Sequence, residues 1–307
     1  MKESTIYSHD VQLAVKHNQP VVALESAVIT HGLPRPINLA LAQDLEAIVR
    51  NGGATPATIA MLKGEIHIGL TKEELNWLAF LDNVRKISKR DFGIAGAGKM
   101  SGGTTVAGTI FAAHHAGIKV FATGGIGGVH RGVPYDVSAD LIEMANSDLI
   151  IVCAGAKAIL DLPGTLEILE TLGVPVIGYQ THQFPAFYSL DSGLLVDHRA
   201  DSVEDIVSIA NAHWGSGIHG SILVAVPPPT SSALDNSFIE TKLQAALKEA
   251  HEKNIHGAAT TPFLLERMNQ LTDGLCMQTN LDLLRNNAKI ATQISISLSH
   301  SQTNNIN

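Results

Sequence analysis

The chain has 307 residues, of which 45% are hydrophobic and 16% are charged, as is typical of a compact globular protein with a large core. Its net charge of −8 argues against a nucleic acid or an anionic membrane as partner, because either would need a basic surface. The two cysteines form no CxxC pair, the N-terminus lacks an apolar signal-peptide core, and no apolar run has membrane-spanning length. We therefore expect a cytoplasmic protein.

The first part of the chain alternates apolar runs with helical patterns. Val21–Leu24 is a run of four apolar residues that predicts a buried strand, and Leu33–Ile37 predicts a loop. From Asn38 onward, apolar residues recur at helical spacing until Gly52 and its neighbours end the helix. Thr71–Leu75 has a capping-box pattern, so a second helix is expected to begin there.

The same alternation continues to the C-terminus. Further strands are predicted at Ile118–Ala122, Leu149–Val152, Val174–Gly178 and Ser221–Val226, with helices at Ala107–Ala116, Ala139–Asn146, Thr165–Leu172 and over about 239–290. Alternating strands and helices form βαβ units, so we predict an α/β fold with three α/β/α layers around a largely parallel, mixed central sheet. We expect a single domain over residues 1–307, with no fused kinase domain and a polar, frayed tail at 301–307.

A glycine-rich stretch that begins at Thr123 follows one predicted strand and leads to several carboxylates. Glycine clusters occur where the main chain turns sharply or lies close to a ligand. Asp136 and Asp140 would face the same side of a helix if that helix already included Asp136, and their oxygens could then bind Mg²⁺ or Mn²⁺. The ordinary alternative is that the two acids stabilise the N-terminus of the helix.

Lys157 and Glu25 are the candidates for covalent and acid–base chemistry. Lys157 lies among small residues after a predicted strand, where an amine that is neutral part of the time could form a Schiff base with a carbonyl. The alternative is a solvated lysine whose stem covers apolar surface. Glu25 follows Val21–Leu24 at the strand end where ligands bind in open α/β sheets, which suits a general acid or base. A surface acid or a helix cap is an equally good interpretation.

The segment Gly102–Val106 precedes a predicted helix and offers main-chain N–H groups and hydroxyls to a phosphate. Neither it nor the glycine-rich stretch matches a P-loop or a dinucleotide fingerprint. Lys86 and the basic residues after it could add positive charge, although a solvated basic turn is the ordinary interpretation. The histidines show no metal-ligand spacing, so we expect structural or surface roles for them. Asn280 either caps a helix or gives a hydrogen bond to a substrate.

Taken together, the segments that carry these candidates resemble one family from about Val21 to Ile290. The segments are ALES (23–26), THG (30–32), KISKRD (86–91), GGTTV (102–106), FATGGIGGVHRG (121–132), DVSADL (136–141), CAGAKAILD (153–161), TLEILETLGVPV (165–176) and TPFLLERMNQLTDG (261–274). The family is that of the pseudouridine-5′-phosphate glycosidases, also called the indigoidine synthase A family.

This resemblance implies a homotrimeric carbon–oxygen lyase of pseudouridine catabolism that reversibly splits pseudouridine 5′-phosphate into uracil and ribose 5-phosphate. It implies a divalent metal, usually Mn²⁺ with Mg²⁺ also possible, held by Asp136. Lys157 corresponds to the Schiff-base nucleophile and Glu25 to the proton donor. The implied substrate contacts are Lys86, Thr104, Thr105, Val106, Ser138, Ala139, Asp140 and Asn280.

Two departures from the family pattern concern loops. The run Ala225–Pro229 lacks the asparagine that often precedes the Pro-x-Pro segment, and the loop over 133–135 is short. Both concern loop closure or trimer contacts and leave Lys157 untouched. Two other functions stay open at this point: a Schiff-base aldolase that acts on a sugar phosphate, and a non-catalytic metabolite-binding protein of the same fold.

Overall fold

The computed structural model describes residues 5–132, 135–255 and 260–304. Within these residues, eleven strands form one mixed sheet. Nine of them lie side by side in the order β1 (Thr5–Tyr7), β4 (Glu65–Ile68), β3 (Thr55–Leu62), β2 (Val21–Leu24), β7 (Val120–Ala122), β9 (Ile150–Cys153), β13 (Ile222–Ala225), β11 (Val176–Tyr179) and β12 (His198–Ala200). The short strands β5 (Arg85–Ile87) and β6 (Gly102–Thr104) extend the sheet through β3.

The sheet is parallel except where β3 pairs with β4 and β6. In β2, β9 and β13 every residue is buried. Such continuous apolar runs are typical of parallel strands that are covered on both faces. The predicted α/β class, with its largely parallel sheet in one domain, is therefore confirmed.

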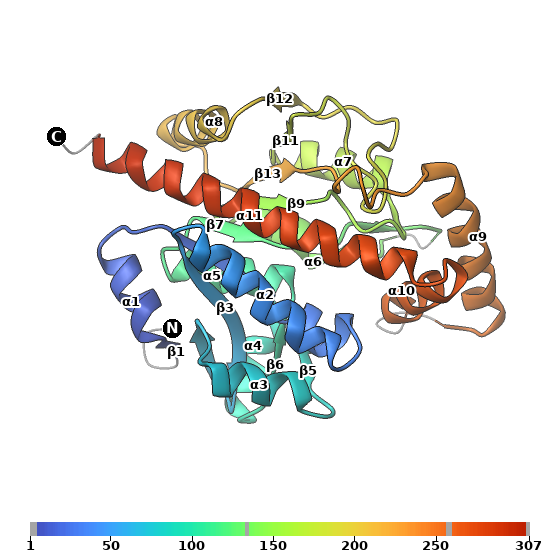
Figure 1. Cartoon of the computed structure of the whole chain (residues 1–307), viewed down its shortest axis with the longest axis horizontal. Helices are drawn as coiled ribbons and strands as arrows, with labels where there is room; N and C mark the ends of the chain where they lie inside the picture. Colours follow the sequence, from blue (N-terminus) through green and yellow to red (C-terminus); the bar gives the residue numbers. More distant parts are fainter. Residues whose placement is uncertain (1–4, 133–134, 256–259, 305–307) are drawn as a thin grey trace.

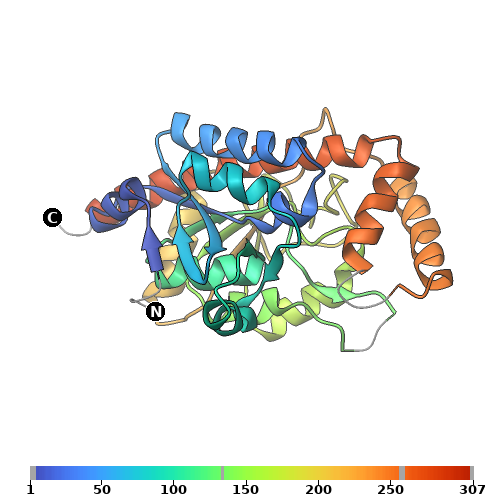
Figure 2. The same cartoon turned by 90° about the horizontal axis from the view of Figure 1, so that it is seen from below.

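Helices cover both faces of the sheet. Figure 2 shows α2 (Ile37–Asn51) and α11 (Leu275–Asn304) on one side, and α5 (Val106–His115) and α6 (Ala139–Ala145) on the other. The remaining helices are α1 (His9–Lys16), α3 (Lys72–Phe80), α4 (Phe92–Ala97), α7 (Leu162–Thr171), α8 (Val203–Gly215), α9 (Asn236–Glu252) and α10 (Thr260–Leu271). The pair α9 and α10 projects at one end of the molecule (Figures 1 and 2).

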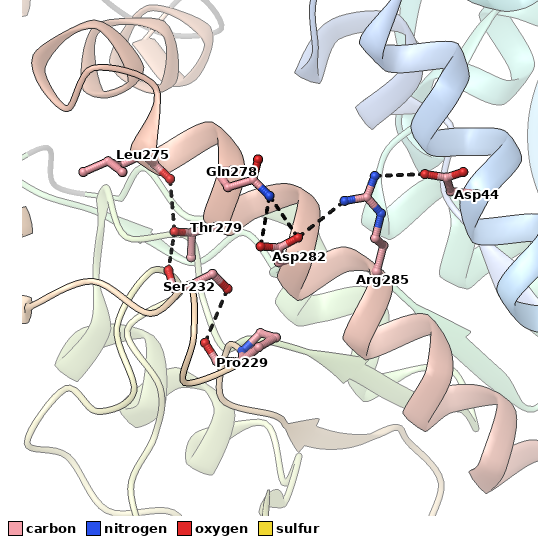
Figure 3. A network of polar contacts seen from close by, with 8 residues as sticks. All are labelled: Asp44, Pro229, Ser232, Leu275, Gln278, Thr279, Asp282 and Arg285. Atoms are coloured by element: carbon pink, nitrogen blue, oxygen red, sulfur yellow. Dashed lines mark hydrogen bonds and ion pairs between the residues drawn. The ribbon is translucent and has the colours of Figure 1, made fainter.

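The long helix α11 crosses the sheet and is tied to its neighbours by a polar network (Figure 3). Arg285 pairs with Asp44 of α2 at 2.9 Å and with Asp282 one turn earlier at 3.4 Å. The hydroxyl of Thr279 donates to the carbonyl oxygen of Ser232 at 2.6 Å. Exposed ion pairs of this kind add at most about 1 kcal/mol each to stability. Their role is to fix the position of α11, which contributes residues to the site described below.

The predicted helical features at Thr71 and near the C-terminus are present, whereas the predicted frayed tail differs from the structure. The predicted capping box at Thr71 is present at the start of α3, and the predicted C-terminal helical region consists of α9, α10 and α11. The expectation of a frayed tail from 301 is wrong as far as Asn304, because α11 continues to that residue; 305–307 lie outside the described residues. Of the short loop over 133–135, only Tyr135 is described. No helix in the described part of the chain is both long and apolar enough to cross a membrane.

Candidate active site

A cavity of about 740 Å³ lies at the carboxyl ends of the neighbouring strands β2, β7 and β9. This volume is in the range of small-molecule sites, and this edge is where ligands bind in open α/β sheets. The sequence-predicted residues that line it are Glu25, Lys86, Thr105, Val106, Asp136, Ser138, Ala139, Asp140, Lys157 and Asn280. Of the predicted site residues, only Thr104 is not part of its wall.

Glu25 directly follows β2 and lies against Thr123, which directly follows the neighbouring strand β7. The Thr123 hydroxyl donates a hydrogen bond to Oε1 of Glu25. Loss of hydration raises the pKa of the Glu25 carboxyl, and this effect outweighs the opposite influence of the positive Lys157 and of the Thr123 hydroxyl. A carboxyl in this environment keeps its proton to a higher pH than an exposed one does, as a general acid requires.

Lys157 lies four residues beyond β9 in a turn that is interlocked with the glycine-rich stretch. Its N–H donates to the carbonyl oxygen of Ile126 at 3.1 Å, and the N–H of Ile126 donates to the carbonyl oxygen of Gly155 at 3.1 Å. Gly155 has a φ of +82°, and a Cβ there would lie 2.5 Å from the carbonyl oxygen of Pro185. Only glycine fits this position without strain, and the two hydrogen bonds tie the backbone that carries Lys157 to the glycine-rich stretch.

Lys86 on β5 lines the same cavity and is exposed to solvent. The surrounding protein lowers the pKa of the Lys86 ammonium by removing part of its hydration, and repulsion by Lys157 lowers it further. Glu25 and Asp140 act in the opposite direction. Two lysines and two carboxylates therefore interact electrostatically within one cavity.

Asp140 is buried and serves as a bridge between two main-chain segments. Its Oδ1 accepts a hydrogen bond from the N–H of Ala107 at 2.8 Å, and its Oδ2 accepts one from the N–H of Gly127 at 2.7 Å. Ser138 caps α6 by accepting a hydrogen bond from the N–H of Asp140 at 3.2 Å. The carboxylate of Asp140 thus joins the first turn of α5 to the glycine-rich stretch.

Asp136 lines the cavity but precedes α6, which begins only at Ala139. Asp136 is therefore not part of the helix that contains Asp140, and the two residues do not share a helix face. Among the described residues, no cluster of three His, Cys, Asp or Glu side chains could hold a metal ion. A single carboxylate together with water can still hold Mg²⁺, because this ion keeps much of its hydration shell.

The segment Gly102–Thr104 forms β6 and does not form the anion loop expected from its glycines. A Cβ on Gly102 would lie 2.0 Å from the carbonyl oxygen of Arg85, so this glycine allows close strand pairing with β5. Thr104 is fully buried, and its hydroxyl donates to the carbonyl oxygen of Ile59 at 2.6 Å. Beyond β6, Thr105 caps α5 and Val106 begins it, and both line the cavity.

Residues 10–297 match the sequence profile of the family described as "Indigoidine synthase A like protein". The chain belongs to this family. Two relatives, from Herpetosiphon aurantiacus and Caldanaerobacter subterraneus subsp. tengcongensis, are both named pseudouridine-5′-phosphate glycosidase. They are 51% and 49% identical over 95% of this chain, and the matches cover 97% and 95% of the relatives. The resemblance predicted from the motifs is thus confirmed.

Solved structures agree with this membership. The crystal structure of the prealnumycin C-glycosynthase AlnA in complex with ribulose 5-phosphate is similar with a TM-score of 0.91 and 37% identity, over 98% of both chains. An indigoidine synthase A-like protein from Thermotoga maritima has a TM-score of 0.86 at 36% identity, over 92% of this chain and 94% of the other.

Two histidines of this family member were not predicted to be part of the site. His31 and His130 both line the cavity. The imidazole of His31 contacts the Thr30 hydroxyl at 2.7 Å and the Val84 carbonyl oxygen at 3.2 Å. Burial lowers the pKa of His31, and the positive charge of Lys86 lowers it further. The spacing of the histidines did not predict this placement. Only the motifs THG (30–32) and FATGGIGGVHRG (121–132) contain these two residues.

Proposed function

We propose that this protein cleaves the C–C glycosidic bond of pseudouridine 5′-phosphate and releases uracil and ribose 5-phosphate. The observation that carries the proposal is the placement of Lys157 and Glu25 in one cavity, beyond strands separated only by β7. The names of the relatives support the choice of substrate. Lys157 would be the nucleophile and Glu25 the acid.

The chemistry of the bond explains why an amine is needed. In a C-glycoside the anomeric carbon C1′ carries no oxygen or nitrogen leaving group outside the ring, so a pair of carboxylates of the ordinary glycosidase type is poorly suited to it. An amine that bonds to C1′ can accept the positive charge as an iminium ion when the C–C bond breaks. The site therefore requires one amine and one acid.

The reaction balances in three steps. Glu25 protonates the ring oxygen O4′ and the C1′–O4′ bond breaks, while the Lys157 nitrogen bonds to C1′ and loses a proton. The nitrogen lone pair then forms the C1′=N bond as the C1′–C5 bond breaks, and C5 of uracil takes up a proton. Water finally hydrolyses the iminium, which frees Lys157 and gives the aldehyde of ribose 5-phosphate. The sum is pseudouridine 5′-phosphate plus water giving uracil plus ribose 5-phosphate, and the enzyme accelerates both directions.

The other cavity residues would bind and orient the substrate. Lys86 supplies positive charge for the phosphate, and the start of α5 at Val106 supplies the positive end of a helix dipole. Asn280 lies inside α11 and lines the cavity, so it does not cap this helix, and we assign it a hydrogen bond to the substrate. Ser138 and Asp140 would fix the wall of the cavity next to Asp136.

The decisive experiment is the detection of uracil by chromatography after incubation of the protein with pseudouridine 5′-phosphate. A Schiff-base aldolase would leave this substrate intact and would cleave a sugar phosphate instead. A non-catalytic binding protein would leave both intact. Either of these two results would disprove the proposed activity.

Glu25→Gln is expected to slow uracil release by about 10²–10⁴-fold, because a general acid contributes a factor of this size. In the wild type, kcat/KM should fall at high pH as Glu25 loses its proton, and the raised pKa of Glu25 places this fall above the usual range of a glutamate. The variant should show no such limb in its pH profile. An unchanged rate with the same limb would exclude Glu25 as the acid.

We further propose that Asp136 holds a divalent ion, Mn²⁺ or Mg²⁺, with water completing its shell. When bound, such an ion supplies positive charge near the substrate. EDTA is expected to abolish most of the uracil release, and either ion should restore it. Asp136→Asn should need a higher metal concentration for the same rate and should bind Mn²⁺ more weakly in electron paramagnetic resonance titrations. Full activity in EDTA would remove the metal from the proposal.

The homotrimer is also part of this proposal. Light scattering of the purified protein is expected to give three times the 32.5 kDa mass of the chain. A monomeric mass for an active preparation would show that trimer contacts are not needed for the site.

A further inference from the structure

A chain of hydrogen bonds connects the long helix α11 to the carboxyl of Glu25. The hydroxyl of Thr123 donates to Glu25 Oε1, and the carbonyl oxygen of Thr123 accepts a hydrogen bond from Asn287 Nδ2 at 2.8 Å. The N–H of Thr123 donates to the carbonyl oxygen of Val152 on β9 at 3.0 Å. Every polar group of Thr123 is therefore bonded, and the residue has one orientation available to it.

Asn287 is fully buried in the middle of α11. Its Nδ2 also lies 3.5 Å from the carbonyl oxygen of Gly124, while its Oδ1 has no hydrogen-bond partner among the described residues. A buried amide oxygen without a partner is unfavourable. The same side chain, however, places its amide N–H₂ group within reach of the carbonyl oxygens of Thr123 and Gly124, where the glycine-rich stretch begins.

Neither Thr123 nor Asn287 lines the cavity, so neither can act on the substrate directly. We propose that both are positioning residues which keep the transferable proton of Glu25 on Oε2. The inference rests on the proposed function, in which Glu25 is the acid. Because the Thr123 hydroxyl hydrogen is directed at Oε1, that oxygen acts as an acceptor, and the carboxyl proton is left for Oε2, which has no partner among the described residues.

Three charged groups also act on Glu25 and must be separated from the effect of the hydroxyl. They are Lys157 and Lys86, which favour its ionised form, and Asp140, which favours its neutral form. Thr123→Val is nearly isosteric and changes none of these charges. It removes a hydrogen-bond donor that stabilises the ionised carboxyl, so the pKa of Glu25 should rise.

Thr123→Val is expected to lower kcat about tenfold with little change in KM, because the acid loses its orientation while the binding groups stay in place. The high-pH limb of kcat/KM should move to higher pH, a change that a merely structural defect would not produce. Thr123→Ser retains the hydroxyl and should restore both the rate and the limb. Asn287→Leu should lower kcat by a smaller factor.

Thr292→Val is the matched control, since Thr292 is a buried threonine of α11 whose hydroxyl donates to the carbonyl oxygen of Ala288 at 2.7 Å, within the same helix. It should leave kcat and the pH profile unchanged. If Thr123→Val does not fold, Thr123→Ala and Thr123→Ser are compared in its place. The positioning role is overturned if the hydroxyl-free variant matches the wild type, or if Thr123→Ser is equally impaired. An inactive wild type would instead refute the proposed function.

Discussion

Lys157→Ala is expected to abolish uracil release, with a loss on the order of 10⁴-fold or more, as is usual when a covalent nucleophile is removed. The structural reason is that the turn over Ala154–Ala158 is held by hydrogen bonds to the glycine-rich stretch, so the amine of Lys157 is carried by a fixed part of the cavity wall. Lys86 also lines the cavity, but it lies on β5, on a separate part of the sheet. The effect is measured as initial rates of uracil formation from pseudouridine 5′-phosphate.

Trapping with cyanoborohydride gives a second readout that does not depend on the full reaction. The wild type incubated with ribose 5-phosphate should gain the mass of one ribose 5-phosphate less one oxygen, located on the peptide that contains Lys157. Lys86→Ala should still be labelled at Lys157, and Lys119→Ala should behave like the wild type, since Lys119 lies near Asp148 and Trp214 outside the cavity. A wild type that carries no adduct on Lys157 would refute the Schiff base.

The class of fold could be predicted from the sequence because central parallel strands leave a simple signal. β2, β9 and β13 are buried on both faces, so each appears as an unbroken apolar run of strand length. The strands β3 and β4 were not predicted. Pro56 lies in β3, and a proline inside a strand normally argues against the assignment, yet this strand is buried and pairs with three others.

The site could be predicted only in part, because its geometry depends on pairings between distant segments. Glu25 and Lys157 were found from their positions after apolar runs, which is information local to each segment. One wrong assignment was that of Gly102 to an anion loop. This glycine allows close strand pairing with β5, and no local sequence pattern distinguishes the two uses. His31 and the bridging role of Asp140 likewise depend on which strands become neighbours.

Asp140→Asn is expected to reduce both stability and activity, because the carboxylate of Asp140 accepts hydrogen bonds from two main-chain N–H groups, one buried and one partly buried. The side chain of asparagine has only one oxygen acceptor. Its N–H₂ group would therefore face the N–H of either Ala107 or Gly127, and that N–H would lose its acceptor. An unpaired buried donor costs about 1–3 kcal/mol, which for a chain of this length corresponds to a fall in Tm of about 2–5 °C. Displacement of the glycine-rich stretch should lower kcat about 10²-fold. Thermal unfolding and steady-state kinetics measure the two effects.

The pH profile of this variant should move in the opposite direction to that of Thr123→Val. The negative charge of Asp140 raises the pKa of Glu25, so its removal lowers that pKa and brings the high-pH limb of kcat/KM to lower pH. Asp161→Asn is the matched control: Asp161 caps α7 by accepting one hydrogen bond, from the N–H of Gly164 at 3.0 Å, and asparagine caps a helix equally well. It should change neither Tm nor the limb. If Asp140→Asn reduces the rate but leaves the high-pH limb at the same pH, Asp140 has only a structural role. Lys157 and Lys86 would then be the charges that act on the pKa of Glu25.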